Sequence, residues 1–333
     1  MTIRPFSASA EVCCRGYSEP LQRAITDFGS DVSFGKIPGK LREHYGIDAP
    51  MSSSRVITLN HAREVFKAQE IRRDIPESPG VEVLIAEMDG SMIPVVEMSA
   101  PADRDEKTDL RTTRKVDWKE ARLCLAHPKD SVTPVYGATI GTPEDAGDHL
   151  LNCAIRAGLG AHTKVHGVGD GATWIADQVS LKFGVQGKYL VDFYHVCDYL
   201  SAAGNVCAKQ DKKSWMDEQK QRMKDGRCSE VLESIQPHLE SESVSSKDAP
   251  VRACHRYFVN RPGQFDYRGA IDAGLPIGSG EIESGHRHVI QDRLKLSGAW
   301  WKHQNAESML AMRVCRANAD WEAYWGARAD NAA

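Results

Sequence analysis

The sequence lacks several features that would place it in a specialised class of protein. No run of about eighteen apolar residues occurs in the 333-residue chain, so we expect no membrane-spanning helix. The N-terminal stretch Met-Thr-Ile-Arg-Pro-Phe-Ser has no apolar segment like that of a secretory signal, which favours the cytoplasm. The nine cysteines include no Cys-x-x-Cys pair, so no zinc ribbon or redox motif is indicated and reduced thiols are expected.

An excess of positive charge is also missing. The formal net charge is −4, and 41% hydrophobic with 26% charged residues is ordinary for a globular protein of two or three domains. The total does not suggest a polyanionic partner, but the distribution of charge matters more than the total. The stretch 286–316 is locally cationic, with Asp292 and Glu307 as its only acids. Its cations are Arg287, Arg293, Lys295, Lys302, Arg313 and Arg316.

Residues 1–80 are predicted to be a polar, helical region. Residues 40–45 and 52–69 have helical patterns, and the turn between them contains Gly46 and Pro50. Ser52, Ser53 or Ser54 is expected to cap the second helix. Two helices joined in this way could form a helix-turn-helix that reads DNA, or could pair subunits. Residues 76–80 (Pro-Glu-Ser-Pro-Gly) are a plausible linker.

From Val81 onward the pattern changes to that of strands. Residues 81–89 alternate and end at Met88-Asp89-Gly90, where an Asp-Gly turn is expected to lead into a second strand over 91–98. Residues 122–126 and 135–140 are further candidate strands. The charged segment from Asp103 to Glu120 is expected to loop out between them.

Alternating helices and strands follow. A helix over 143–157 is expected, capped by Thr142 and stopped by Gly158, and then a strand over 163–168, a helix over 173–183, a strand over 188–193 and a helix over 195–208. This order predicts an α/β fold with a mixed sheet and flanking helices, the order found in ribonuclease H-like folds. Residues 209–275 are predicted to be a helical insertion, and 276–333 to be C-terminal helices.

Three carboxylates stand out by their positions. Asp89 and Asp170 end predicted strands beside glycines, and Glu283 lies where a new helix begins. Carboxylates gathered at one sheet edge would repel one another unless a cation lay between them, and oxygen ligands suit Mg²⁺ or Mn²⁺. Two such ions can activate an attacking hydroxyl and stabilise a leaving oxygen in phosphoryl transfer.

The glycines around Asp170 allow a second interpretation. Residues 167–172 fit the G-x-G-x-x-A pattern of dinucleotide-binding loops, and Asp192 lies about twenty residues further on, as that pattern expects. This would make the chain an NAD-binding oxidoreductase. Against it, Asp170 would place a negative charge in a loop meant to hold pyrophosphate, and the motif lies in mid-domain instead of opening it.

Several blocks of the sequence are similar to bacterial insertion-sequence transposases of the DDE type. The resemblance is to the group typed on the Kra element, distant relatives of the Mutator superfamily, and it extends over nearly the whole chain. The blocks that carry it are residues 16–29, Val165 to Ile175 (Val-His-Gly-Val-Gly-Asp-Gly-Ala-Thr-Trp-Ile), Leu190 to Val196, Leu275 to Gly285 and Asp292 to Trp301.

The resemblance implies a ribonuclease H-like catalytic core, residues 81–208, completed by 276–333 after the insertion. It places the metal-binding triad at Asp89, Asp170 and Glu283. Glu281 is a near rival because two glutamates flank Ile282, although the family usually keeps only the second and has an aliphatic residue at the first position. Asp192 and His195 match a D-x-x-H element, so His195 could orient a metal-bound water or contact a phosphate. The candidate DNA-facing residues are Arg287, Arg293, Lys295, Trp300 and Trp301, although one of the two tryptophans could equally belong to the core.

The implied activity is DNA cleavage followed by strand transfer, with two Mg²⁺ or Mn²⁺ ions. The implied partners are the terminal repeats of an insertion sequence and target DNA, bound by a homodimer or larger assembly near the nucleoid. A descendant that binds DNA without cutting it is the main alternative, although all three acids are present.

Overall fold

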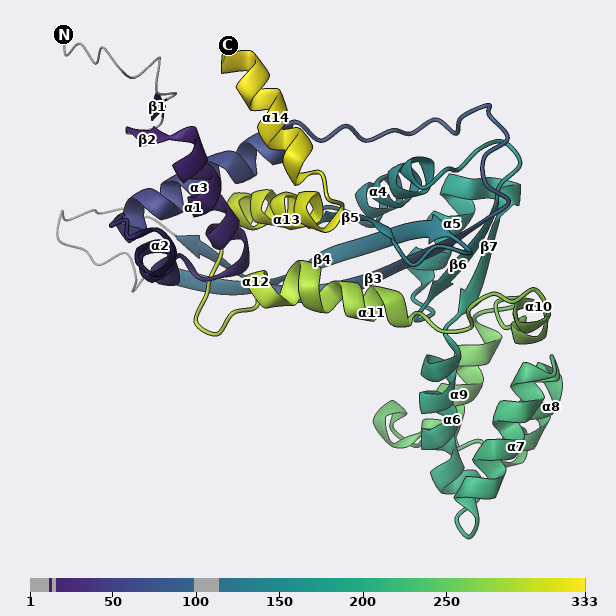
Figure 1. Cartoon of the computed structure of the whole chain (residues 1–333). Helices are drawn as coiled ribbons and strands as arrows, with labels where there is room; N and C mark the ends of the chain where they lie inside the picture. Colours follow the sequence, from purple (N-terminus) through teal and green to yellow (C-terminus); the bar gives the residue numbers. More distant parts are fainter. Residues whose placement is uncertain (1–11, 14–15, 99–113, 333) are drawn as a thin grey trace.

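A five-stranded mixed sheet forms the centre of the computed structural model in Figure 1, which describes residues 12–13, 16–98 and 114–332. The strand order is β5-β4-β3-β6-β7. Within this sheet, β3, β4 and β5 are antiparallel neighbours, whereas β6 and β7 run parallel to β3. The predicted mixed sheet with flanking helices is therefore confirmed. The strands are β3 (Val83–Met98), β4 (Arg114–Pro128), β5 (Val135–Thr139), β6 (Lys164–Gly169) and β7 (Gly187–Val191).

The expected turn at Asp89-Gly90 is wrong, because β3 continues through it. Asp89 pairs with Leu123 and Gly90 pairs with Arg122 of β4. Gly90 lies at a close approach and not in a turn, since a Cβ there would meet Glu120 Oε1 at 2.1 Å unless that side chain moved. Part of the loop expected between Asp103 and Glu120 is also strand, because β4 begins at Arg114. Residues 103–113 of that expected loop lie outside the described residues.

Alternation along the strands gives the sheet two differently covered faces. On one face Leu84, Ala86 and Met88 pack against helices α4 and α5. On the other face Ile93 and Val95 of the same strand pack against the C-terminal helices. The helices over these faces are α4 (Pro143–Arg156), α5 (Thr173–Phe183), α11 (Gly280–Gly285), the π-helical segment η5 (His286–Gln291), α12 (Asp292–Leu294) and α13 (His303–Ala317).

The helix ends follow the local sequence closely. Thr142 and Asp145 form the capping box of α4, as its Thr-Pro start suggests, and Gly158 after its end has φ +104°. The strand expected at 163–168 and the helix at 173–183 correspond to β6 and α5. No helix in the described part of the chain has both the length and the apolar character needed to cross a bilayer.

A separate helical lobe projects below the sheet in Figure 1. It contains the predicted insertion together with α6, which was expected to belong to the core, and it has its own aromatic and aliphatic core, to which the sheet contributes Leu190 and Val191 of β7. Its helices are α6 (Phe193–Cys207), α7 (Lys212–Lys224), α8 (Cys228–Ile235), α9 (Pro250–Val259) and α10 (Tyr267–Asp272).

The N-terminal region contains the two helices expected there, but the second begins at Met51 after Pro50 instead of after a capping serine. Residues 1–11 of this region lie outside the described residues. The second helix packs against α1 and α13, which leaves it a narrow exposed face. The elements are β1 (Val12–Cys13), β2 (Tyr17–Ser18), α1 (Glu19–Asp31), α2 (Ile37–Tyr45), α3 (Met51–Lys67) and, against them, α14 (Trp321–Ala332).

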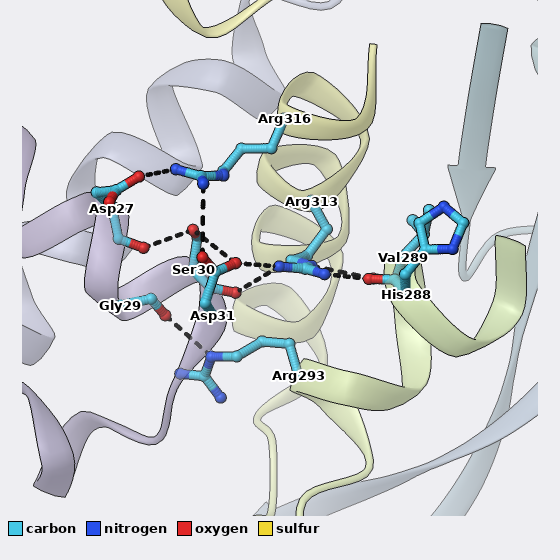
Figure 2. Close-up of polar contacts among 9 residues, drawn as sticks. All are labelled: Asp27, Gly29, Ser30, Asp31, His288, Val289, Arg293, Arg313 and Arg316. Carbon is cyan, nitrogen blue, oxygen red and sulfur yellow. Dashed lines mark hydrogen bonds and ion pairs between the residues drawn. The ribbon is translucent and has the colours of Figure 1, made fainter. Parts of the chain in front are cut away.

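Three arginines fasten the end of α1 to the C-terminal helices, as Figure 2 shows. Arg316 pairs with Asp27 and Arg313 pairs with Asp31. Arg313 also donates to the carbonyl oxygens of His288 and Val289 in η5. The Nε of Arg293 donates to the carbonyl oxygen of Gly29 at 2.9 Å. The N-terminal helices are thereby joined to the segment that follows α11.

The contact between α1 and α3 depends on a small residue at position 29. A Cβ on Gly29 would lie 2.2 Å from Thr58 Oγ1, so Gly29→Ala should force the two helices apart. We expect it to lower the free energy of unfolding by about 1–3 kcal/mol in urea titrations. Gly39→Ala is the matched control, because Gly39 lies on exposed α2 with no atom within 4 Å of its Cβ position. That change should stabilise by about 0.5–1 kcal/mol, and equal losses in both variants would contradict the packing argument.

Candidate active site

Three aspartates lie at one level across neighbouring parallel strands. Glu87 pairs with Val168, and two residues further along their strands are Asp89 and Asp170. Gly169 pairs with Val191, so Asp170 and Asp192 also follow their strands at equal height. The carboxyl ends of β6 and β7 therefore bring two acids beside the middle of β3, on the face that α11 crosses.

Asp170 is held in a tight turn after β6. Its Oδ1 accepts a hydrogen bond from Ala172 N at 2.7 Å, which fixes the carboxylate against its own backbone. Gly171 has φ +85°, a conformation that glycine adopts without strain. Asp170 is only partly buried.

Helix α11 crosses β3 with Ile282 facing the sheet. Ile282 N donates to Glu87 Oε2 at 2.8 Å, which pins the helix to the strand. Glu281 turns toward β4, where its Oε2 is 2.9 Å from His127 Nε2. Successive helical residues are about 100° apart, so Glu283 projects to the opposite side of Ile282 from Glu281.

His286 lies on the same side of the helix as Glu283, one turn further on. Its Nε2 is 3.3 Å from Asp89 Oδ2. Asp89 also accepts a hydrogen bond from Gly90 N at 2.7 Å. The arrangement therefore places Glu283, and not Glu281, on the side of α11 that faces Asp89.

Glu87 and His286 are two members of this group that the sequence analysis does not single out. Glu87 is 2% exposed, and desolvation raises its pKa to about 8, with nearby Glu281, Asp192 and Glu283 adding to the shift against the Ile282 hydrogen bond. One sequence signal points to Glu87: it lies in an otherwise apolar part of the strand, two residues before Asp89 and thus on the same face. His286 follows Glu283 at the i+3 spacing.

Asp192 has a structural role, and its predicted catalytic role stays a prediction. Its Oδ1 caps α6 by accepting from the N–H groups of Tyr194 and His195, and its Oδ2 accepts from Ser279 N and Oγ at 2.5 and 2.6 Å. Four donors fill the acceptor positions of the carboxylate. His195 is half-buried in the first turn of α6, and its role toward a water or phosphate stays a prediction.

Two of the five candidate DNA-facing residues are buried, which corrects that prediction. Arg293 is 1% exposed and lies between the rings of Phe34 and Trp301, 4.6 and 4.7 Å from their centroids. Trp301 is itself 4% exposed, and its backbone pairs with β3. These two residues hold the core together because a planar guanidinium packs well on aromatic faces. Arg287, Lys295 and Trp300 are exposed and stay candidates.

The glycines of the dinucleotide-like pattern serve packing. Gly167 and Gly169 lie inside β6, where Cβ atoms would meet Val179 of α5 at 3.1 Å and Tyr189 Oη at 2.8 Å. A pyrophosphate loop needs such glycines in a turn at a helix start. This placement does not favour the oxidoreductase alternative.

The donor set fits a hard divalent cation by its chemistry. Asp89, Asp170 and Glu283 offer carboxylate oxygens, and neither Asp170 nor Glu283 forms an ion pair with any described residue. As they stand, no three His, Cys, Asp or Glu side chains of the described residues are gathered closely enough to hold a metal. Glu283 is exposed, so its side chain can turn without displacing a packed neighbour.

The fold and site define a mixed α/β protein with a cluster of acids under a crossing helix. Residues 159–327 match the model of an uncharacterised protein family, UPF0236, and this is just over half of the 333-residue chain. The chain belongs to that family. The match begins just before β6 and therefore includes Asp170, the helical lobe and Glu283. No curated protein matches the chain.

The buried Glu87 carboxyl makes stability depend on pH. Its pKa is about 8 in the folded chain against an ordinary value of 4.5, so its contribution is complete below about pH 4.5 and is lost as the pH rises through about 8. The loss is at most about 1.4 kcal/mol per pH unit in that window. Glu87→Gln keeps an acceptor for Ile282 N without a titrating proton.

We therefore expect the Gln variant to gain stability relative to the unmodified protein between pH 5 and pH 9. Urea unfolding in metal-free buffer at several pH values measures this difference. A difference that stays constant across the range would show that Glu87 titrates normally.

Proposed function

We propose that this chain is a DDE-type DNA transposase that cleaves and joins DNA with divalent metal ions. The observation that carries the proposal is the placement of Asp89 and Asp170 at one level of adjacent parallel strands, with Glu283 on the facing side of the crossing helix. The sequence blocks similar to insertion-sequence transposases include Asp170 and Glu283. The family match covers the same segment without naming an activity.

The architecture supports the same proposal. Counting β3 as the first strand of the sheet, the order is 3-2-1-4-5, with the first three strands antiparallel and the last two parallel to the first. This sheet is compatible with a ribonuclease H-like fold. A helical lobe lies between β7 and α11, where the resemblance implies an insertion before the last acid.

The residues of the chain divide the work of the reaction. Asp89, Asp170 and Glu283 would hold Mg²⁺ or Mn²⁺, which when bound supplies activation of the attacking hydroxyl and stabilisation of the leaving oxygen. His286 lies against Asp89 and would fix the orientation of that carboxylate. Exposed Arg287, Lys295 and Trp300 would bind the DNA strand beyond the acids. The protein acts by positioning and electrostatics, with no covalent intermediate.

The first test is cleavage of a labelled duplex that carries the end of the flanking element. Asp170→Asn should lower the rate of Mg²⁺- or Mn²⁺-dependent nicking by more than about 100-fold, because the ligand loses its charge. Asp177→Asn is the matched control, because Asp177 lies on the exposed side of α5, and this variant should nick DNA at the normal rate. If the unmodified protein and both variants bound the duplex and none of them cleaved it, the result would favour the descendant that binds DNA without cutting it.

The two glutamates of α11 give a second test. Glu283→Gln should reduce nicking by more than about 100-fold, since Glu283 projects toward Asp89. Glu281→Gln should change the rate only a few-fold, because Glu281 faces His127 on the other side of the helix. Rates measured at several Mn²⁺ concentrations separate weaker metal binding from slower chemistry. The reverse order of the two effects would make Glu281 the third ligand.

A further inference from the structure

The helical lobe reaches back to the backbone that carries Asp170. Tyr257 Oη donates to the carbonyl oxygen of Asp170 at 2.7 Å, and Arg261 Nε donates to the carbonyl oxygen of Gly171 at 2.6 Å. From the sheet side, Gly171 N donates to Tyr189 Oη at 3.0 Å. Three side chains therefore satisfy three consecutive polar groups of this short turn.

The two lobe residues form one stacked unit. The Arg261 guanidinium lies 3.8 Å from the centroid of the Tyr257 ring, and its Nη1 donates to the carbonyl oxygen of Tyr257. On the other side, the ring of Tyr199 from α6 stacks on Tyr257 with centroids 3.9 Å apart and planes at 25°. The stack joins two lobe helices, so the position of the Tyr257 hydroxyl is set by the packing of the lobe.

The turn and the stack are fitted to each other. A Cβ at Gly171 would lie 2.5 Å from Tyr257 Oη and 2.7 Å from Arg261 Nε, so no larger residue leaves room for these contacts. Tyr257 is 5% exposed, and burial raises the pKa of its hydroxyl, which therefore keeps its proton and remains a donor. The catalytic proposal makes no use of Tyr257 or Arg261.

We propose that Tyr257 and Arg261 are positioning residues for Asp170. They hold the Asp170–Gly171 backbone so that the carboxylate keeps its orientation, and metal binding at the acids thereby depends on the docking of the lobe. The inference rests on the proposed function, in which Asp170 is a metal ligand. Groups that orient a ligand commonly change metal affinity by about 10–100-fold when they are removed.

The test compares two tyrosines of the same lobe. Tyr257→Phe removes the hydroxyl on Asp170 and keeps the stacked ring. Tyr267→Phe removes a hydroxyl that donates to the carbonyl oxygen of Val191 at 3.0 Å, in the same aromatic core but away from the turn. Mn²⁺ binding to the full chain is followed by loss of the free-ion electron paramagnetic resonance signal. We expect about tenfold weaker binding in Tyr257→Phe, and less than twofold change in Tyr267→Phe.

A second variant, at a less buried residue, separates loss of the contact from loss of folding. Arg261 is only partly buried, and Arg261→Met should also weaken Mn²⁺ binding several-fold while the far-ultraviolet circular dichroism stays unchanged. Unchanged affinity in both Tyr257→Phe and Arg261→Met would overturn the proposal. An equal loss in Tyr257→Phe and Tyr267→Phe would also overturn it, because it would mean general loosening of the lobe.

Hydrogen exchange separates failure of this inference from failure of the proposed function. The Gly171 amide donates to Tyr189 Oη of β7, and the Ala172 amide donates to Asp170 Oδ1 within the turn. They should exchange about tenfold faster in Tyr257→Phe than in Tyr267→Phe, with or without metal. If the unmodified protein bound no Mn²⁺ and cleaved no DNA, the proposed function would fail, yet this difference would still show that the lobe holds the turn. Equal exchange in the two variants would refute the positioning role.

Discussion

The carboxylate of Asp192 joins the start and the end of the helical lobe, whose chain returns to the sheet 87 residues later at Ser279. One oxygen caps the helix that leaves the sheet, and the other receives both donors of Ser279, where the chain returns. His166 on β6 adds a contact to the carbonyl oxygen of Pro276, so the returning loop is fixed at two points. The start of α11, and therefore the location of its glutamates, depends on this closure. A buried carboxylate is stable there because every acceptor position is occupied.

Three acidic residues of the site have three different roles, which their surroundings determine. Asp192 is saturated with donors, Glu87 is desolvated and holds a proton near neutral pH, and Asp170 is partly exposed with one hydrogen bond to Ala172 N. Burial and hydrogen bonding decide these differences, and neither can be read from the residue type. Because Glu87 is neutral, it adds no negative charge beside Glu281, Glu283 and Asp192, and the repulsion between α11 and the sheet is smaller.

The sequence predicted the regular elements wherever local chemistry determines them. The Thr-Pro start of α4, the strand before Gly169 and the helix after Ala172 are governed by caps, alternation and glycine. The predictions were wrong where a contact between residues distant in sequence determines the conformation or burial of a residue. Gly90 suggested a turn, but the side chain of Glu120 from the neighbouring strand accounts for it. Arg293 and Trp301 looked suited to DNA, but they stack on each other beneath the N-terminal helices. Whether Asp192 is free or saturated depended on Ser279, 87 residues away.

The continuous strand β3 has a mechanical consequence. At about 3.3 Å per residue, a strand of 16 residues spans roughly 50 Å, and it carries Asp89 near its middle and the contacts with Trp301 beyond it. Asp89 and the part of β3 that contacts Trp301 therefore belong to one continuous ladder of hydrogen bonds with β4, and neither can move against the other without breaking it. The lobe lies outside this ladder, because the chain enters it after β7 and leaves it before α11.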